Sequence, residues 1–433
     1  MSECIRGAVG APSRVLAPLR STIWNAPTPI HDSTVRGSTP LEEAGGVVPM
    51  AQVSERRLIT ISANTAWFLH NFRGGLIRSL VLKGYRVVVL APEDAYFGRL
   101  QALGCEVLDM PMDNKGTNPV RDAGLFLRFQ KQYHRLKPTV ALHFTIKPAI
   151  YGGFAARILG IPYVSTIPGL GTPFIRENWV TRVVEVLYRA SQKRAERIFF
   201  LNNEDHNVFL SRRLAPPQRL EILGGEGVDL EHFPMTDLPG GSEFRYLFIG
   251  RLLRDKGVME FVDAARRVRA TASHSRFQLL GPCGVENRSA IQRETLDAWV
   301  KEGIVEYLGE TDDVRPHISR AHCIVLPSYR EGSPRALLEG AAMGRPLIAT
   351  DATGSRDIVD DGVTGFLCRT HDADDLADKM QRLLNLPVGL RRAMGEAGRA
   401  KVERQFSEDR LIGRYRSIID GIAVRIGTQR PPG

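Results

Sequence analysis

Residues 244–257 read FRYLFIGRLLRDKG, an apolar run that ends at a glycine and leads into a loop with several cations. Continuous apolar runs of this kind are typical of strands in a parallel sheet that helices bury on both faces. The glycine at the end of the loop marks the point where we expect a helix to begin. The stretch therefore predicts one strand–loop–helix unit of a doubly wound α/β domain.

The same alternation of apolar runs and helix-length segments fills most of the chain. Further apolar runs occur in two groups. The first group is RLITIS (57–62), RVVVLA (86–91), TVALHF (139–144), PYVSTI (162–167) and RIFFLN (197–202). The second group is FQLLG (277–281), IVEYLG (304–309), HCIVLP (322–327) and PLIATD (346–351). A polar segment separates the groups, and a chain of 433 residues exceeds what one core usually organises. We predict an N-terminal domain over residues 54–237 and a C-terminal domain over residues 238–433, closed by helices at 373–385 and 389–424.

The start of the chain differs from the rest. Residues 1–53 are rich in Gly, Pro, Ser and Thr and show no sustained periodicity, so we expect a disordered N-terminal extension. One interpretation is that translation begins at Met50, which would leave residues 1–49 out of the native protein.

Cysteine and charge usage narrow the function classes. The five cysteines form no Cys-x-x-Cys pair, which argues against a disulfide framework or a zinc site and favours a cytoplasmic location. No run reaches the roughly 18 apolar residues needed to cross a bilayer, so we expect a soluble protein or a peripheral one at the inner face of the cytoplasmic membrane. Residues 51–237 carry 24 basic and 17 acidic side chains, which indicates an anionic partner. Without a zinc-finger or RNA-binding signature, an anionic lipid surface is favoured over nucleic acid.

Candidate binding residues cluster in YREGSPRALLEGAAMG (329–344). A proline fits the first helical position there, so the backbone N–H groups of Gly332 and Ser333 would lie at a helix N-terminus that favours phosphate. Glu331 precedes this helix and Glu339 lies inside it, and a carboxylate accepts paired hydrogen bonds from vicinal hydroxyls. The segment predicts a site for a phosphorylated sugar or ribose, and the alternative is that the two glutamates are ordinary acids of a surface helix.

A second group of candidates follows the strand at 244–250. Gly250 ends that strand, and Arg251 and Lys256 lie in the loop after it, where fixed positive charge would neutralise a diphosphate. Taken alone, each cation is better interpreted as a solvated surface side chain. Ligands of such sheets bind beyond the carboxyl ends of the strands, where both loops lie, so the combination favours function.

These motifs resemble the donor-binding domain of the retaining glycosyltransferases of family 4. The resemblance rests on an ordered series, which is FIGRLLRDKG, FQLLGPCG, VEYLGETDDV and PSYREGSPRALLEGAAMGRPLIATDATGSRDIVDDGVTGFL. It covers residues 57–424, and Glu331 and Glu339 match the E-x7-E motif of that family. The resemblance implies the GT-B fold, in which two Rossmann-like doubly wound domains face a central cleft.

Carried over residue by residue, the resemblance implies a donor site for a nucleotide sugar, with UDP as the expected nucleotide. Glu331 would bind hydroxyls of the donor sugar, and Glu339 would bind the ribose. Arg251 and Lys256 would hold the diphosphate, together with the N–H groups that follow Glu331. A hexose or N-acetylhexosamine would be transferred with retention, and Glu331, Arg251 and Lys256 are the expected catalytic residues.

We expect neither a metal ion nor another cofactor. Asp372-Ala-Asp374 matches the letters of the Asp-x-Asp motif, which holds a divalent ion in sugar transferases of a different fold. The two acids stand at the start of a predicted helix after a hairpin, where acidic side chains commonly cap the helix. We therefore predict a capping role for them.

Residues 143–174 resemble a bacterial subgroup that extends oligosaccharides on polyprenyl-diphosphate carriers. By that resemblance, Lys147 and Gly169 would contact the phosphates of a lipid-linked saccharide acceptor, and His143 would face the cleft. A turn explains Gly169 equally well, and a satisfied histidine at a strand end explains His143 equally well. The chain departs from many relatives, which place a histidine against the donor sugar where residues 167–169 read IPG.

The segment WVTRVVEVLYRASQKRAER (179–197) predicts a helix with two stripes. The basic stripe comprises Arg182, Arg189, Lys193 and Arg197, and the apolar stripe comprises Trp179, Val183, Val186, Leu187 and Ala190. A helix that lies on a membrane surface meets anionic headgroups in this way. An apolar face packed inward, with the basic face in water, fits the pattern equally well.

These expectations favour transfer of a sugar to a lipid-linked saccharide in bacterial surface polysaccharide or lipopolysaccharide biosynthesis. Two alternatives stay open at this point. One is a nucleotide-sugar-binding protein without transferase activity, and the other is a nucleotide-sugar epimerase of the same fold. The epimerase would need acids and bases around the sugar that the motifs do not provide.

Overall fold

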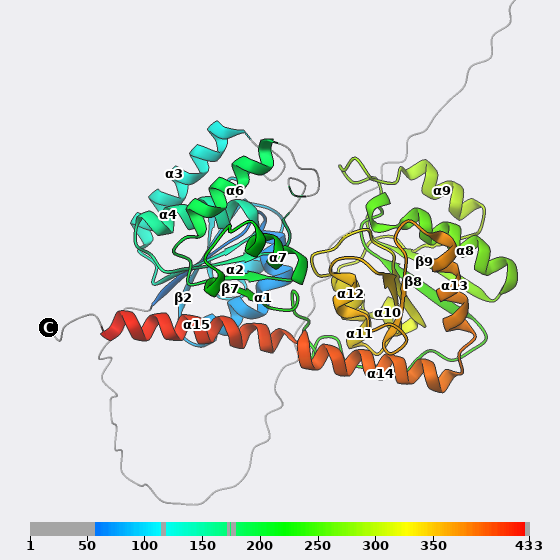
Figure 1. The fold of residues 1–433 in the computed structure, drawn as a ribbon. Helices are drawn as coiled ribbons and strands as arrows, with labels where there is room; N and C mark the ends of the chain where they lie inside the picture. Colours follow the sequence, from blue (N-terminus) through cyan, green and yellow to red (C-terminus); the bar gives the residue numbers. More distant parts are fainter. Residues whose placement is uncertain (1–56, 114–117, 171–173, 175–178, 429–433) are drawn as a thin grey trace, which may run out of the picture. The chain divides into compact units, whose positions relative to one another are not determined.

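Two parallel sheets carry the fold, and helices cover each of them (Figure 1). The computed structural model describes residues 57–113, 118–170, 174 and 179–428. The extension expected at residues 1–53 lies outside the described residues. Every strand pairing between named strands is parallel, so the prediction of two doubly wound α/β units is confirmed.

The first sheet has the strand order β3-β2-β1-β4-β5-β6-β7. Its strands are β1 (Leu58–Ser62), β2 (Arg86–Ala91), β3 (Glu106–Asp109), β4 (Val140–Phe144), β5 (Tyr163–Ile167), β6 (Arg197–Phe200) and β7 (Leu220–Ile222). The helices between them are α1 (Ala66–Leu82), α2 (Phe97–Gln101), α3 (Pro119–Leu136), α4 (Gly153–Ile158), α6 (Trp179–Gln192) and α7 (Asn203–Ser211), with a π-helical turn at Pro148–Gly152 and a 3-10 turn at Pro217–Arg219. β1 pairs with both β2 and β4, and all its residues are buried, as expected for the apolar run at its position.

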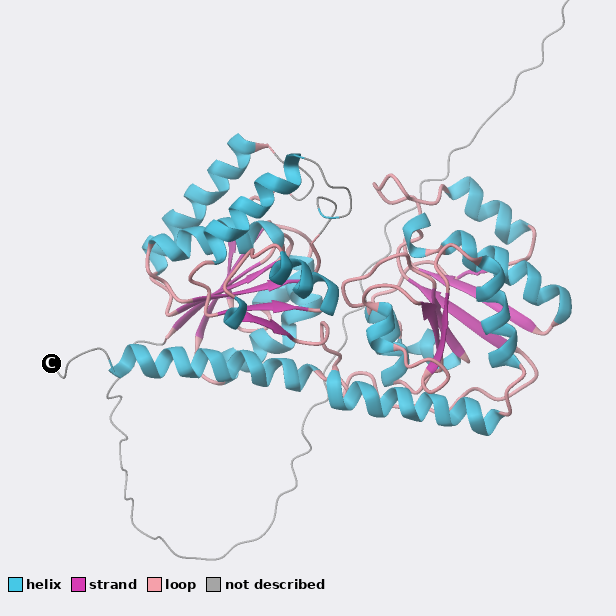
Figure 2. Ribbon diagram, viewed as in Figure 1, coloured by secondary structure: helices cyan, strands magenta, loops and turns pink. Residues whose placement is uncertain are grey.

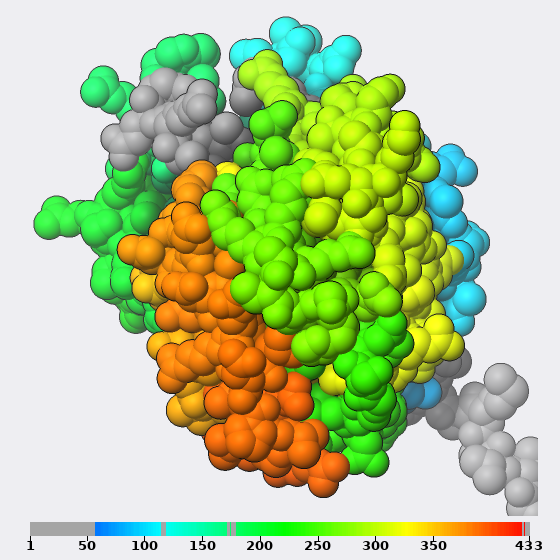
Figure 3. Space-filling view, turned by 90° about the vertical axis from the view of Figure 1, so that its right-hand side faces the viewer, coloured from blue at the N-terminus to red at the C-terminus, as the bar shows by residue number. Residues whose placement is uncertain are grey.

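The second sheet has the order β10-β9-β8-β11-β12-β13. Its strands are β8 (Phe244–Ile249), β9 (Ser275–Leu280), β10 (Glu306–Tyr307), β11 (Cys323–Leu326), β12 (Leu347–Thr350) and β13 (Gly365–Cys368). Its helices are η3 (Arg254–Lys256), α8 (Val258–Thr271), α9 (Arg293–Lys301), α10 (Arg315–Arg320), α11 (Arg335–Ala342), α12 (Ser355–Ile358), α13 (Ala373–Leu384) and α14 (Val388–Gln405). Figure 2 shows the strands of each sheet enclosed by helices. On the outer surface of this domain, α8 and α13 lie side by side (Figure 3), joined by an ion pair of 2.9 Å between Arg267 and Asp374.

Side chains at the helix starts satisfy backbone N–H groups that the helices leave open. Thr65 caps α1 by accepting from the N–H of Phe68, and Asn202 caps α7 by accepting from Asp205. Asp372 accepts from the N–H of Asp375 at the start of α13. The predicted capping role is thus confirmed for Asp372.

The sequence patterns do not predict β3, β7 or β13. β3 and β7 are the edges of the first sheet, and β13 is an edge of the second. β3 and β7 contain no buried residue, so they need no continuous apolar run, whereas β13, with the sequence GFLC, was missed although it is mostly buried. β3, with the sequence EVLD, has two exposed and two half-buried residues.

The last two helices divide between the two cores. The segment expected as one helix at 389–424 is broken near Phe406 into α14 and α15 (Glu408–Thr428). α14 packs against α11 of the second sheet. The buried residues of α15 instead join the core of the first sheet, where the ring of Tyr415 lies 5.1 Å from that of Phe199. The expected boundary at residues 237/238 assigns α15 to the second domain, whereas its apolar stripe completes the first core.

Substitutions at two glycines of α14 test how closely this helix packs against the end of α11. A Cβ on Gly395 would overlap the backbone carbonyl oxygen of Gly344, just after α11, whereas a Cβ on Gly389 would meet nothing within 4 Å. We expect Gly395→Ala to lower the free energy of unfolding by roughly 1–3 kcal/mol, because backbone must move. Gly389→Ala should raise it by up to about 1 kcal/mol, because alanine favours the helix. Urea denaturation measures both, and equal effects would contradict the close approach.

Candidate active site

The loop after β8 is held against the loop after β11 by backbone contacts. Gly257 has φ +72°, and a Cβ on it would overlap the carbonyl oxygen of Pro327. The N–H of Tyr329 donates to the carbonyl of Asp255 at 3.0 Å. This approach requires glycine, and it sets Lys256 beside Glu331.

Lys256 and Glu331 form an ion pair between Nζ and Oε1. Their side chains are 22% and 10% exposed, so the pair is largely withdrawn from solvent. The loop after β12 supports the glutamate, because the N–H of Glu331 donates to the carbonyl of Thr353 at 3.0 Å. Gly354 follows with φ +80°, and a Cβ there would lie 2.6 Å from the carbonyl oxygen of Glu331. The sequence patterns do not predict this contact between the loop after β12 and Glu331. The glycine that follows β12, Gly354, is the feature of the sequence that could have indicated it.

Gly332 and Ser333 are fixed by groups from the first sheet. The carbonyl of Gly332 accepts from Asn202 Nδ2 at 3.3 Å, and Ser333 Oγ accepts from the N–H of Glu226 at 3.2 Å. In the described part of the chain, neither the N–H of Gly332 nor that of Ser333 donates to a protein group. Both donors therefore remain available for an anion at the start of α11.

Glu339 lies on α11, which begins at Arg335 rather than at the proline before it. That proline occupies the N-cap with extended backbone, one position earlier than predicted. Glu339 is buried and forms an ion pair of 2.9 Å with Arg335, one turn earlier. Burial raises the pKa of the Glu339 carboxyl, and the Arg335 guanidinium opposes that rise. Glu339 is thus a buried acid with one cationic partner, which sequence reasoning did not identify.

Gly250 and Arg251 lie directly after β8. The N–H of Gly250 donates to the carbonyl of Leu280 at 2.9 Å, and a Cβ on Gly281 would overlap the Gly250 carbonyl. These two glycines let the loops after β8 and β9 approach. Arg251 is exposed, and its guanidinium has no hydrogen bond or ion pair within the residues that the structure describes. It is therefore a positive charge that a ligand can neutralise.

His143 does not face a cleft. It is fully buried in β4, and Tyr133 OH lies 2.7 Å from its Nε2. Burial lowers the pKa of the imidazole to about 3, so it is neutral at ordinary pH. The interpretation as a core histidine at a strand end is the one that fits, although its Nδ1 has no hydrogen-bond partner among the described residues, and an acceptor-binding role for His143 is not supported.

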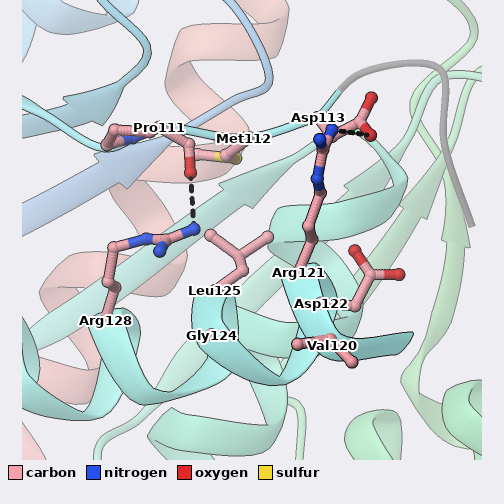
Figure 4. A pocket seen from close by; sticks show the side chains of 9 residues that line it. All are labelled: Pro111, Met112, Asp113, Val120, Arg121, Asp122, Gly124, Leu125 and Arg128. Carbon is pink, nitrogen blue, oxygen red and sulfur yellow. Dashed lines mark hydrogen bonds and ion pairs between the residues drawn. The ribbon is translucent and has the colours of Figure 1, made fainter. Parts of the chain in front are cut away.

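Lys147 lies at the carboxyl edge of the first sheet, beside a pocket of about 600 Å³. Its Nζ is 2.7 Å from Asp122 Oδ1, and Tyr151 OH donates to Asp122 Oδ2 at 2.9 Å. Figure 4 shows the pocket between the start of α3 and the segment after β3, with Arg121, Asp122 and Arg128 among its lining. Lys147 does not itself line this pocket, and its ion pair with Asp122 connects it to the pocket wall.

Gly169 is half-buried after β5, and a Cβ on it would meet nothing within 4 Å. Its φ is not positive, so neither turn geometry nor space requires glycine at this position. The structure gives Gly169 no contact that would mark it as a binding residue.

α6 exposes an apolar stripe. Trp179 is 75% exposed, Val186 60% and Val183 47%, so this part of the helix is not packed inward. Arg189 pairs with Glu185 at 3.1 Å on the same helix. The helix ends at Gln192, so the prediction that Arg197 continues the basic stripe is wrong, because Arg197 begins β6.

Two features are absent from the described residues. These residues contain no group of three or more His, Cys, Asp or Glu side chains placed to hold a metal ion. Nor do they include a helix with both the length and the apolar character to span a bilayer.

Comparisons with known proteins agree on one class. Residues 71–226 match the description "Glycosyl transferase 4-like domain", and residues 243–386 match "Glycosyl transferases group 1". A Campylobacter jejuni protein named N,N'-diacetylbacillosaminyl-diphospho-undecaprenol alpha-1,3-N-acetylgalactosaminyltransferase is 27% identical over 82% of this chain and 96% of its own length. An Escherichia coli UDP-Gal:alpha-D-GlcNAc-diphosphoundecaprenol alpha-1,3-galactosyltransferase is 25% identical over 61% of this chain and 71% of its own.

Solved structures share the fold at low sequence identity. A glycosyltransferase from Rickettsia africae superposes with a TM-score of 0.69 and 16% identity, over 85% of this chain and 99% of that one. HepE of Anabaena, in complex with UDP and glucose, gives a TM-score of 0.67 and 16% identity with the same coverage. Both are similar to this chain throughout its two sheets.

His143→Gln tests the core role of this histidine. A histidine held neutral in the fold binds fewer protons than the unfolded chain between pH 6.5 and about 3, so stability falls as pH falls through that window. We expect His143 to contribute up to about 1.4 kcal/mol per pH unit to this slope, so the slope should be smaller by up to that amount in the variant. Denaturation between pH 7 and pH 5 measures it, and identical slopes would contradict this assignment.

Proposed function

The chain belongs to the glycosyltransferases that join a 4-like domain to a group 1 domain in the GT-B fold, and we propose that it is a retaining enzyme that uses a UDP-sugar. The sugar is a hexose or N-acetylhexosamine. The acceptor is a saccharide joined through a diphosphate to a polyprenol, in bacterial surface polysaccharide or lipopolysaccharide assembly. The names of the C. jejuni and E. coli relatives, both transferases to undecaprenyl-diphosphate-linked sugars, support this acceptor class.

The observation that carries the donor assignment is the Lys256–Glu331 pair beside two open N–H groups. A diphosphate placed against these N–H groups would be within reach of Lys256 and of exposed Arg251. Fixed positive charge at this place stabilises the negative charge that develops on the departing nucleotide. The stabilisation is strong because the cations and N–H groups are already in position and need no reorganisation. Glu331 would then accept hydrogen bonds from the sugar hydroxyls and Glu339 from the ribose diol. A diphosphate leaves without a general acid, so the absence of histidine from residues 167–169 does not prevent this chemistry.

The pocket beside Lys147 is the proposed place of the acceptor. It lies at the carboxyl edge of the first sheet, where ligands of doubly wound domains bind. Its lining combines two cations, Arg121 and Arg128, and two acids, Asp113 and Asp122, with apolar side chains such as those of Leu125 and Met112. This mixture suits a ligand that joins a diphosphate to an apolar chain, and Lys147 would supply charge from its edge.

α6 is the proposed contact with an anionic membrane at the inner face of the cytoplasmic membrane. Its exposed stripe of Trp179, Val183 and Val186 runs beside exposed Arg182 and Arg189. Aromatic and apolar side chains enter the interface while basic side chains meet headgroups. An enzyme held at the membrane surface through α6 would be close to an acceptor whose lipid lies in that membrane.

The two alternatives are less well supported. The relatives above are named as transferases, which favours transfer over binding alone or epimerisation. An epimerase would release a changed nucleotide sugar without any acceptor, so product analysis with and without acceptor separates the three activities.

Glu331→Ala tests the donor site. We expect transfer to fall by roughly a hundredfold or more, because the sugar loses its carboxylate partner and Lys256 its counter-ion. Transfer of radiolabelled sugar from a panel of UDP-sugars to polyprenyl-diphosphate saccharides measures it. Glu396→Ala, an exposed acid on α14, is the control and should leave the rate unchanged. A near wild-type rate for Glu331→Ala would mean that the assigned site is wrong.

Substituting Arg182, Arg189 and Lys193 with glutamine tests the membrane contact. Each basic residue near an anionic surface contributes about 1 kcal/mol, so we expect binding to phosphatidylglycerol vesicles to weaken at least tenfold. Vesicle flotation measures binding. A variant with Arg293, Lys301 and Arg392 changed to glutamine removes the same charge from exposed positions on α9 and α14, and it should bind normally. Equal binding by all three proteins would remove the proposal.

A further inference from the structure

The side chain of Arg335 makes three contacts with different parts of the site. Its Nε pairs with Glu339 Oε1 at 2.9 Å, and its Nη1 donates to the carbonyl of Asn71. Its guanidinium lies 4.9 Å from the centre of the Phe72 ring. Asn71 and Phe72 belong to α1 of the first sheet, whereas Glu339 belongs to α11 of the second. The Asn71 carbonyl and the Phe72 ring thus hold the guanidinium on the side of α1, and the Glu339 carboxylate contacts its Nε.

The charge of Glu339 depends on this arrangement. Its carboxyl is buried, which raises its pKa, and Arg335 is the cation that counters the effect. The strands beside α11 bring no charged side chain, since β11 reads CIVL and β12 reads LIAT. The charged side chains on other elements around α11 are Arg399 of α14, Asp357 of α12, Glu408 of α15 and Arg73 of α1.

The two cations of this set are paired with other groups, and Asp357 accepts from Asn203 Nδ2 at 3.5 Å. Arg399 pairs with Glu403 and donates to the Ala342 carbonyl, and Arg73 pairs with Glu226. The carboxyl of Glu408 is itself mostly buried, which raises its pKa, and it lies near both Arg335 and Arg73. Among the described residues, Arg335 alone is paired with Glu339.

We propose that Arg335 is a positioning residue for donor binding, which keeps the Glu339 carboxylate charged and directed at the ribose diol while α1 fixes its guanidinium. The inference rests on the proposed function, in which Glu339 binds the ribose. A carboxylate accepts two hydrogen bonds from vicinal hydroxyls, whereas a protonated carboxyl turns one of its oxygens into a donor. Charge-assisted hydrogen bonds are also about twice as strong as neutral ones. Loss of Arg335 therefore weakens the ribose contact without removing any group that touches the nucleotide.

The contact with α1 adds a structural consequence. Asn71 and Phe72 lie near the middle of α1, so the helix that packs on the first sheet reaches the donor carboxylate through one side chain. A donor nucleotide binds best when α1 and α11 are in the arrangement that orients Arg335. Arg335 is thereby one link through which the first domain influences donor affinity, beside the contacts of Asn202 and Glu226 with Gly332 and Ser333.

The test is UDP binding by isothermal titration calorimetry at pH 6.5 and pH 8.5. UDP has a phosphate that titrates in this range, so each variant is compared with the wild type at the same pH. We expect Arg335→Gln to bind UDP about tenfold more weakly at pH 6.5 and to lose less affinity relative to the wild type at pH 8.5, because a higher pH favours the ionised form of a carboxyl whose pKa burial raises. Arg335→Lys keeps the positive charge but loses the planar guanidinium with its several N–H donors and its contact with the Phe72 ring. The loss of UDP affinity should therefore be smaller than for Arg335→Gln and less dependent on pH.

Two further variants separate the contributions. Phe72→Leu leaves Arg335 and Glu339 in place but removes the ring under the guanidinium, and we expect a loss of about twofold to threefold. Arg293→Gln is the matched control, because Arg293 pairs with Asp297 at the same 2.9 Å and the same spacing on α9, away from α11. It should bind UDP like the wild type at both pH values. Circular dichroism melts of each variant establish that it is folded.

The outcomes are distinct. Wild-type binding by Arg335→Gln at both pH values overturns the inference, and so does a loss of equal size at both. Glu339→Ala decides the underlying function separately. If it binds UDP normally, the proposed donor site is wrong, whereas weak binding by Glu339→Ala with normal binding by Arg335→Gln leaves the donor site standing and removes only the role of Arg335.

Discussion

The parallel direction of the strands is the constraint on which the candidate site depends. Since β8, β11 and β12 run the same way, the loops that follow them leave from one edge of the second sheet. Lys256 and Glu331, which are 75 positions apart in the chain, then meet without any long-range motif. Glycines at the loop ends permit backbone contact where a side chain would intervene. Lys256 lies in the loop after β8 and Glu331 in the loop after β11. Their ion pair forms because the parallel strands bring these two loops to the same edge of the sheet.

Charge compensation is the second property of the site. Each of its two acids has one cation: Glu331 has Lys256, and Glu339 has Arg335. Partly buried acids are costly unless paired, so these cations stabilise the site before any ligand arrives. Arg251 and the N–H groups after Glu331 are positive elements beyond these pairs. The local excess is therefore positive, as recognition of an anionic diphosphate requires.

Sequence reasoning predicted the central strands well because their residues are buried on both faces. β2 begins and ends at Arg86 and Ala91, as the run RVVVLA predicts. It also assigned Glu331 and Lys256 to one site, and the structure brings these two side chains together in an ion pair, whereas the ligand remains a prediction. It failed for His143, since a histidine at the end of an apolar run looks the same whether its ring faces a cleft or the Tyr133 hydroxyl in the core. Arg335 was missed because an arginine four residues before a glutamate resembles an ordinary surface pair, and only the packing of α1 distinguishes it.

The division of the C-terminal helices has a consequence for recombination between relatives. Because α15 supplies Leu411, Tyr415 and Ile419 to the core of the first sheet, that core is built from two segments distant in the chain. An exchange of the first domain at the polar segment near residue 237 would bring in a sheet shaped for a different α15. A chimera of two such enzymes therefore needs two crossovers, one before β8 and one at the break between α14 and α15. The exchangeable unit of this protein is discontinuous in sequence.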